Sequence, residues 1–167
     1  IEDYADNPMT AEAYYQKAQF YYQKTDEIDP ETGKAKIKNW AIAHEICEAA
    51  IKKYPKSFGA RECQRLMVTI ESKSLSFQTE QVNLPNKSFL VNIQHANLEL
   101  AHFKLIEIDE DEMQKFNRMR YEEQLKKLNK QKALRKWNVK LPQEGDFRQH
   151  SVEVKVDALP LGTYVLM

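Results

Sequence analysis

The sequence of 167 residues is poor in glycine, proline and cysteine, and it contains no long apolar run. Four glycines and six prolines are too few for a low-complexity or disordered chain. No apolar stretch approaches the roughly 18 residues that a membrane-spanning helix requires. The charges balance, with 25 basic and 25 acidic side chains, so no net field attracts nucleic acid or an anionic membrane. We therefore expect a globular chain with no nucleic-acid partner and no direct membrane insertion.

The two cysteines, Cys47 and Cys63, lie almost symmetrically about Tyr54-Pro55-Lys56-Ser57. If two helices meet there in an antiparallel hairpin, both sulfur atoms lie at a similar height along it. Packed helices usually hold Cα atoms too far apart for a disulfide, which favours two buried free thiols. A disulfide stays open as the alternative, and a zinc site would need further Cys or His ligands nearby in the sequence.

Residues 8–72 show the apolar spacing of three and four residues that is typical of helices. We predict one helix that Thr10 caps, a second over about residues 35–53, and a third that Ser57 caps. The link at Tyr54-Pro55 and the small alanines around it resemble a tetratricopeptide-type helix pair, although no repeat of about 34 residues is present. The sequence thus predicts a helical region over residues 1–73.

After Ser74 the apolar period changes to two, as in half-buried strands. Six strands are predicted, at residues 75–79, 89–93, 100–108, 133–141, 151–158 and from 163 onward. Because short turns join them, we expect an antiparallel sandwich or barrel over residues 74–167. One helix, from about Asp109 to Lys130, interrupts the strands. The predicted fold class is therefore α+β, a helical hairpin region followed by a sandwich with one inserted helix.

The inserted helix lies in a basic stretch. From Lys115 to Lys136 there are nine basic side chains and only two acidic ones, Glu122 and Glu123. RNA binding would combine such a stretch with exposed aromatic side chains, but Phe116 and Tyr121 are predicted to pack inside. We expect a solvated helix face. The two tryptophans, Trp40 and Trp137, are likewise predicted to be buried in the cores of the two regions.

The sequence carries no recognisable catalytic or metal-binding motif. The histidines are scattered, at His44, His95, His102 and His150. No glycine-rich phosphate loop and no Gly-x-Ser-x-Gly motif occurs. The acidic run Asp109–Glu112 lacks the alternating ligands and central glycine of a calcium loop, so it is better explained as a helix start. We predict no catalytic, cofactor-binding or metal-binding residue and no enzyme; only a pocket that joins His102 or His150 to a carboxylate would favour one.

Four local patterns follow one another along the chain: Tyr-Pro-Lys-Ser at 54–57, Ser-Leu-Ser-Phe at 74–77, Gly145-Asp146-Phe147 ahead of His150-Ser151, and the turn and strand at 157–164. In this order, over most of residues 41–167, they resemble the amino-terminal region of large alpha-2-macroglobulin family proteins of Bacteroides-type bacteria. In that family a short helical region leads into a string of macroglobulin domains, each a seven-stranded antiparallel sandwich. The resemblance implies that residues 74–167 are such a domain, complete or shortened at its C-terminal end.

The resemblance also implies a function. This chain would be the non-catalytic N-terminal scaffold segment of a large protease inhibitor in the periplasm or cell envelope. Its partners would be later domains of the same polypeptide and, through the full-length protein, proteases. The family's Cys-x-Glu-Gln thioester is not matched, since Cys47 precedes Glu48-Ala49-Ala50 and Cys63 precedes Gln64-Arg65-Leu66. The alternative is a freestanding binding module that recognises a peptide or a glycan.

Overall fold

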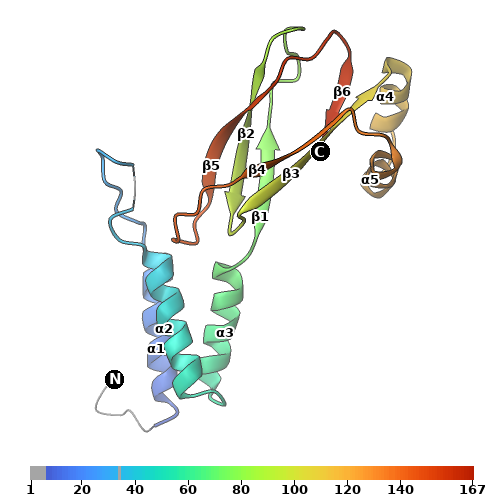
Figure 1. Ribbon diagram of the computed structural model, residues 1–167. Coiled ribbons are helices and arrows are strands. Elements are labelled where there is room, and N and C mark those ends of the chain that lie inside the picture. Colours follow the sequence, from blue (N-terminus) through green and yellow to red (C-terminus); the bar gives the residue numbers. More distant parts are fainter. Residues whose placement is uncertain (1–6, 34) are drawn as a thin grey trace. The chain divides into compact units, whose positions relative to one another are not determined.

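The computed structural model describes residues 7–33 and 35–167, and this part of the chain contains five helices and six strands. The architecture is mixed α+β, as predicted, and it divides into two compact units (Figure 1). The helical unit holds the residues up to Ser74 together with residues 143–150, and the strand unit holds residues 75–142 and 151–167. The sequence predicts domains of residues 1–73 and 74–167, so the difference lies in the segment 143–150, which folds with the helices.

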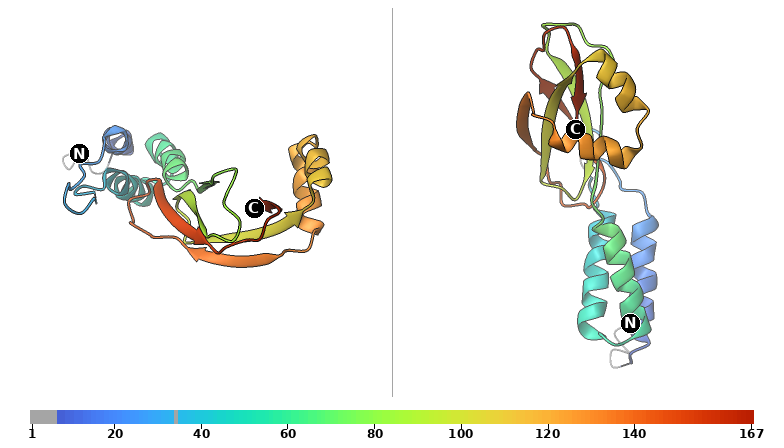
Figure 2. Two further views of the ribbon diagram at one scale, coloured as in Figure 1. Left: turned by 90° about the horizontal axis from the view of Figure 1, so that it is seen from above. Right: turned by 90° about the vertical axis from the view of Figure 1, so that its right-hand side faces the viewer.

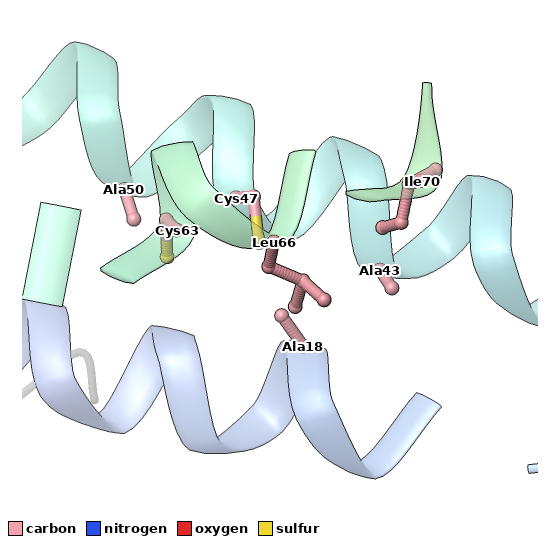
Figure 3. Close-up of a cluster of buried hydrophobic side chains, with 7 residues drawn as sticks. All are labelled: Ala18, Ala43, Cys47, Ala50, Cys63, Leu66 and Ile70. Carbon is pink, nitrogen blue, oxygen red and sulfur yellow. The ribbon is translucent and has the colours of Figure 1, made fainter. Parts of the chain in front are cut away.

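Three helices build the helical unit: α1 (Thr10–Gln23), α2 (Asn39–Lys53) and α3 (Phe58–Ile70). Each packs against the other two, and Figure 2 shows the three lying side by side. Their shared core consists mainly of short side chains (Figure 3), namely Ala18, Ala43, Cys47, Ala50, Cys63, Leu66 and Ile70. Short side chains allow close approach of the helices. At Gly59 the approach is so close that a Cβ atom would lie 2.3 Å from the backbone carbonyl carbon of Ala11.

Of the three helix starts predicted from the sequence, one agrees with the structure and two differ from it. Ser57 caps α3 as predicted, since its Oγ accepts a hydrogen bond from the backbone N–H of Ala60 at 3.1 Å. Thr10 does not cap α1, because it lies buried inside the first turn. The second helix begins at Asn39, later than predicted, where Asp26 Oδ1 accepts the Asn39 backbone N–H at 3.0 Å. A carboxylate distant in sequence thus provides this cap.

All six predicted strands are present, and they form two small antiparallel sheets without a closed barrel in the described part of the chain. One sheet has the order β1 (Ser74–Gln78), β2 (Phe89–Ala96), β5 (His150–Val156). The other has the order β4 (Arg135–Lys140), β3 (Leu100–Ile108), β6 (Thr163–Leu166). In the second sheet Phe103 lies opposite Trp137 and Ile106 opposite Val165.

Side chains from both sheets contribute to one hydrophobic cluster. Val91 and Ile93 come from β2, and Ala101 and Phe103 come from β3. Phe77 of β1 meets Phe103 edge to face, with ring centroids 5.8 Å apart. This contact links the two sheets. The core of the strand unit therefore contains side chains from both sheets.

The prediction that both tryptophans are buried is wrong. Trp137 stacks on Phe103 with ring centroids 5.4 Å apart, but it is only half-buried because β4 is an edge strand of its sheet. Trp40 is half-buried as well.

The single helix predicted over Asp109 to Lys130 is two helices, α4 (Glu110–Asn117) and α5 (Tyr121–Lys130). The chain turns between them, and Glu123 Oε2 accepts the backbone N–H of Arg120 to start α5. The acidic pair that follows Arg120 therefore marks a second helix start. Tyr121, predicted to pack inside, is 72% exposed.

The two short helices cover one end of β3. Phe116 of α4 and Leu128 of α5 pack with Ile106 and Ile108 in a separate buried cluster. Side chains alternate between the two faces of a strand, so these isoleucines face away from Phe103. The break between α4 and α5 lets both helices present an apolar residue to the same face. Lys104 fixes this arrangement, since its Nζ donates to the Leu128 carbonyl at 2.5 Å.

Candidate functional site

A group of polar contacts involves residues 143–150, in the connection from β4 to β5, which we call the strap. Two of its residues have left-handed backbone angles, Gly145 (φ 66°) and Phe147 (φ 61°). Between them Asp146 is buried, and its Oδ1 accepts the backbone N–H of Arg148 at 3.0 Å. This tight turn directs the side chains of Phe147 and Arg148 to the helical unit, where both have partners.

Arg148 makes three kinds of contact with α2 and with the connection between α1 and α2. Its Nε donates to Asp26 Oδ2 at 2.9 Å, and its Nη2 donates to the carbonyl of Lys24 at 2.9 Å. Its guanidinium carbon lies 4.1 Å from the ring centroid of Trp40, a cation–π distance. Because only 8% of the Asp26 side chain is exposed, this ion pair is shielded from solvent on the carboxylate side.

Trp40 owes its half-buried position to this arrangement. It stacks on Tyr22 with ring centroids 4.7 Å apart, and its Nε1 donates to the Tyr22 carbonyl at 2.9 Å. Arg148 lies over the ring of Trp40 as well. The indole therefore links α1, α2 and the strap, a role that its position on an apolar helix face did not predict.

Phe147 and Glu144 supply two more anchors for the strap. Phe147 stacks on His44 of α2 with ring centroids 4.8 Å apart. His44 Nε2 lies 2.7 Å from Glu71 Oε1, and 18% of the His44 side chain is exposed, so this histidine lies at the rim of the core. Lys38 Nζ donates to the backbone carbonyl of Glu144.

His150, at the end of the strap, bonds to the buried carboxylate of Asp146 through Nε2 at 2.8 Å. Burial alone would raise the pKa of Asp146, but the hydrogen bonds from His150 and from the Arg148 backbone N–H outweigh it. The pKa of Asp146 is therefore lowered from its usual 3.8. The ionised form of Asp146 is therefore favoured, and it accepts hydrogen bonds from His150 and from the Arg148 backbone N–H.

The chemistry open to this site depends on the hydrogen-bond and stacking partners of its side chains. A histidine beside a carboxylate is one part of an acid–base centre, but a reaction also needs a nucleophile or a place for a substrate. Asp146 is engaged by two donors within the strap, and His44 is engaged by Glu71 and Phe147. Among the described residues no group of three His, Cys, Asp or Glu side chains could hold a metal ion. The contacts that are present hold the strap in place.

The structure does not bring the four histidines into one site. His95 is buried in β2, and His102 is exposed on β3 in the strand unit. His102 Nδ1 lies 2.7 Å from Oδ1 of Asn138, its register partner on β4, so it has a hydrogen-bond partner within the sheet. His44 and His150 contribute to contacts of the strap.

The remaining sequence candidates have structural roles. Asp109 caps α4, because its Oδ1 accepts the backbone N–H of Glu112 at 2.8 Å, which confirms the helix start predicted for this acidic run. Cys47 and Cys63 are free thiols, buried in the helical core. The hydrogen bond with Cys63, together with burial, raises the pKa of the Cys47 thiol. The same hydrogen bond, donated by Cys47, lowers the pKa of Cys63.

Sequence reasoning did not predict the strap. The pattern Gly145-Asp146-Phe147 was noticeable only as part of the family resemblance, and nothing local pairs Arg148 with Asp26, 122 residues away. The glycine followed by an aspartate is a turn signal that could have indicated a tight, ordered connection. No family model, curated protein or solved structure matches the chain.

Proposed function

We propose that this chain is a non-catalytic scaffold segment at the amino-terminal end of an alpha-2-macroglobulin-type protease inhibitor. The proposal rests on one observation: the side chains most suited to catalysis are engaged in contacts within the protein. The charged and aromatic groups of the strap bind one another and the helices, and both thiols lie in the helical core. A segment of this kind positions other domains and leaves the reaction with a protease to them.

The same proposal makes the strand unit a macroglobulin-like sandwich. Two antiparallel three-stranded sheets with a shared cluster of inward side chains support it. The Phe77–Phe103 contact between the sheets supports it further. The helical unit would then be the short helical region that precedes the first macroglobulin domain, with a tetratricopeptide-like packing of α2 on α3 across Tyr54–Ser57. A location in the periplasm or at the cell envelope belongs to this proposal. None of the helices in the described part combines the length and apolar character that crossing a membrane requires.

The partners in this proposal are later domains of the same polypeptide, and one surface of the strand unit suits them. The β1–β2 loop and the β5–β6 loop are joined by a hydrogen bond from the Asn86 backbone N–H to the Leu159 carbonyl, at 2.7 Å. Three aliphatic side chains on these loops are exposed, namely Val82 at 86%, Leu84 at 67% and Leu161 at 85%. Exposed apolar side chains on loops joined in this way could form such a contact surface.

The same loops favour the second candidate, a freestanding module that binds a peptide or a glycan. A binding screen separates the two functions. The chain would be titrated with peptide and glycan libraries, and Val82→Ser with Leu161→Ser would serve as the matched variant. The scaffold function predicts no saturable binding with a dissociation constant below about 10 µM. Saturable binding that the double variant abolishes would favour the module and count against the scaffold.

A further inference from the structure

The outer edge of β4 is open to a further strand. β4 is an edge strand, and in the described part of the chain it pairs only with β3 (Figure 1). On β3, Lys104 exchanges two backbone hydrogen bonds with Met167, at 2.8 and 3.0 Å, so its backbone groups face β6. Its register partner Lys136 on β4 therefore directs its own N–H and carbonyl away from β3, and by alternation Asn138 and Lys140 do the same. Three residues of β4 thus offer backbone donors and acceptors along this edge.

The same three residues make one face of the sheet basic. Side chains alternate along a strand, so Lys136, Asn138 and Lys140 lie on one face, and all three are exposed. The register adds Lys104 and His102 of β3 to this face, opposite Lys136 and Asn138. Two like charges directly opposite each other are unfavourable, and no acidic residue of β3 or β4 lies on this face to offset them. An anionic partner would relieve this repulsion.

The other face of β4 is apolar and only partly covered. Trp137 and Val139 belong to it, and both are half-buried where they pack against the hydrophobic cluster of the strand unit. A strand added at the edge would place its own side chains beside them. Such a strand therefore fits best with apolar side chains on this face and acidic side chains on the lysine face.

We propose that the open edge of β4 binds an extended peptide segment of alternating acidic and apolar residues by antiparallel strand addition. The backbone of the segment pairs with Lys136, Asn138 and Lys140, and main-chain hydrogen bonds of this kind supply affinity. Its carboxylates lie opposite these residues, and its apolar side chains extend the row formed by Trp137 and Val139. Because the side chains of a strand alternate, the acidic residues occupy every second position of the segment.

Charge selects this partner over a second copy of the chain. If two β4 edges paired antiparallel about Asn138, Lys136 of one copy would lie opposite Lys140 of the other, at both ends of the pairing. Lysines on an edge strand oppose self-pairing for this reason. An acidic strand turns the same repulsion into attraction, which is discrimination by charge. A single-stranded nucleic acid fits less well, because the exposed face of β3 and β4 carries no Phe, Tyr or Trp on which bases could stack.

The test titrates the full chain with the labelled peptide TEVEVET and follows its fluorescence anisotropy. We expect saturable binding with a dissociation constant on the order of 100 µM at low salt, weakened at least about threefold in 0.5 M salt. This affinity lies above the 10 µM limit of the scaffold test and does not involve Val82 or Leu161, so the two experiments can fail independently.

Hydrogen exchange measured by NMR shows whether the peptide adds as a strand. With the peptide at roughly ten times its dissociation constant, the amides of Lys136, Asn138 and Lys140 should exchange about tenfold more slowly. The amides of Trp137 and Val139 already face β3 and should change little. Contact between charges alone would not produce this alternation. A peptide that keeps the three glutamates but carries a methyl group on each of their backbone nitrogens should not bind, because those donors face β4.

Lys136→Glu combined with Lys140→Glu should weaken binding of TEVEVET at least about tenfold. Lys87→Glu combined with Lys155→Glu is the matched control, since it makes the same change of charge at exposed positions elsewhere in the strand unit, and it should stay within about twofold of the natural chain. The first variant should instead bind TKVKVKT, in which lysine replaces each glutamate, and this gain shows that β4 is still folded.

Four results would overturn the proposal. They are no saturable binding of TEVEVET up to about 2 mM, equal weakening by the two double variants, equal binding of the methylated peptide, and tighter binding of a thymidine oligonucleotide of the same charge.

Discussion

Arg148 donates a hydrogen bond from Nε to Oδ2 of Asp26 at 2.9 Å, although 122 residues separate them in the sequence. Asp26 also accepts the backbone N–H that starts α2, so one carboxylate both caps a helix and holds the strap. Arg148 in turn lies over Trp40 and bonds to the Lys24 carbonyl. The order of residues 143–150 and the start of α2 therefore depend on the same small group of side chains.

Replacing Arg148 by alanine should release the strap. The variant leaves the buried Asp26 carboxylate with one partner fewer and removes the cation–π contact, so we expect a loss of about 1–3 kcal/mol in the free energy of unfolding. Hydrogen exchange should speed up at residues 143–150. Arg148→Lys should recover only part of the stability, because an ammonium group lacks the planar guanidinium that lies over Trp40 while it donates to both oxygen atoms.

Arg65→Ala is the matched control for this prediction. Arg65 pairs with Glu62 at 2.6 Å, but 77% of its side chain is exposed and both residues lie on α3. Exposed pairs three residues apart on a helix contribute about 0.3–0.5 kcal/mol or less. If urea unfolding gives equal losses in the free energy of unfolding for Arg148→Ala and Arg65→Ala, the strap contact contributes no more to stability than an exposed ion pair does.

Asp146 should make stability dependent on pH in the acid range. Its pKa is lower in the folded protein than the usual 3.8, so the folded state binds this proton more weakly than the unfolded chain does. The contribution is fully present above pH 3.8 and is lost as the pH falls through the lowered value. Asp146→Asn should be less stable than the natural chain near neutral pH, and the difference should shrink toward low pH.

Urea unfolding midpoints across the acid range test this prediction. Asp111→Asn makes the same change of charge at an exposed position in the first turn of α4 and serves as the control. If the difference between Asp146→Asn and the natural chain stays constant from neutral pH down to the lowest pH measured, the carboxylate does not carry the effect.

Gly59→Ala should destabilise the helical unit, although alanine favours helices by up to about 1 kcal/mol over glycine. The added Cβ would lie 2.3 Å from the backbone of Ala11, and a backbone cannot rotate out of the way as a side chain does. We expect a loss of about 1–3 kcal/mol as α1 is pushed from α3. Gly33→Ala is the comparison variant. A Cβ atom at Gly33 would meet no neighbouring atom, so only the left-handed φ of 68° would make alanine unfavourable there. A stabilised Gly59→Ala protein in thermal unfolding would show that the two helices do not touch there.

Trp137→Ala should cost about 2–3 kcal/mol, less than the 3–5 kcal/mol typical of a fully buried tryptophan, because the ring is half-buried. The loss comes from its stacking on Phe103. Trp137→Phe, which keeps a stacking ring, should lose less than half as much. A loss below about 0.5 kcal/mol for Trp137→Ala in denaturant unfolding would mean that β4 does not hold this ring against the core.

Much of the secondary structure could be predicted from the sequence, because the apolar period changes from helical to alternating near Ser74. All six strands and the Ser57 cap follow from such local patterns. The break at Arg120 was missed, since the apolar spacing from Phe116 to Leu128 continues across it and tertiary packing on β3 decides where the chain turns. The strap was missed for a stronger reason: its contacts join residues more than 100 positions apart, and no local pattern encodes such a pair.

The central claim, that this segment is scaffold without inhibitory activity of its own, is tested most directly by mixing it with proteases. The folded chain would be incubated with a serine, a cysteine and a metalloprotease, each then assayed on a large protein substrate and examined for covalent adducts. We predict unchanged cleavage rates and no adduct with micromolar chain, because the polar groups of the strap and both thiols are committed to internal contacts. Protection of the substrate at concentrations below about 1 µM, or a covalent adduct with any of the three, would contradict the account.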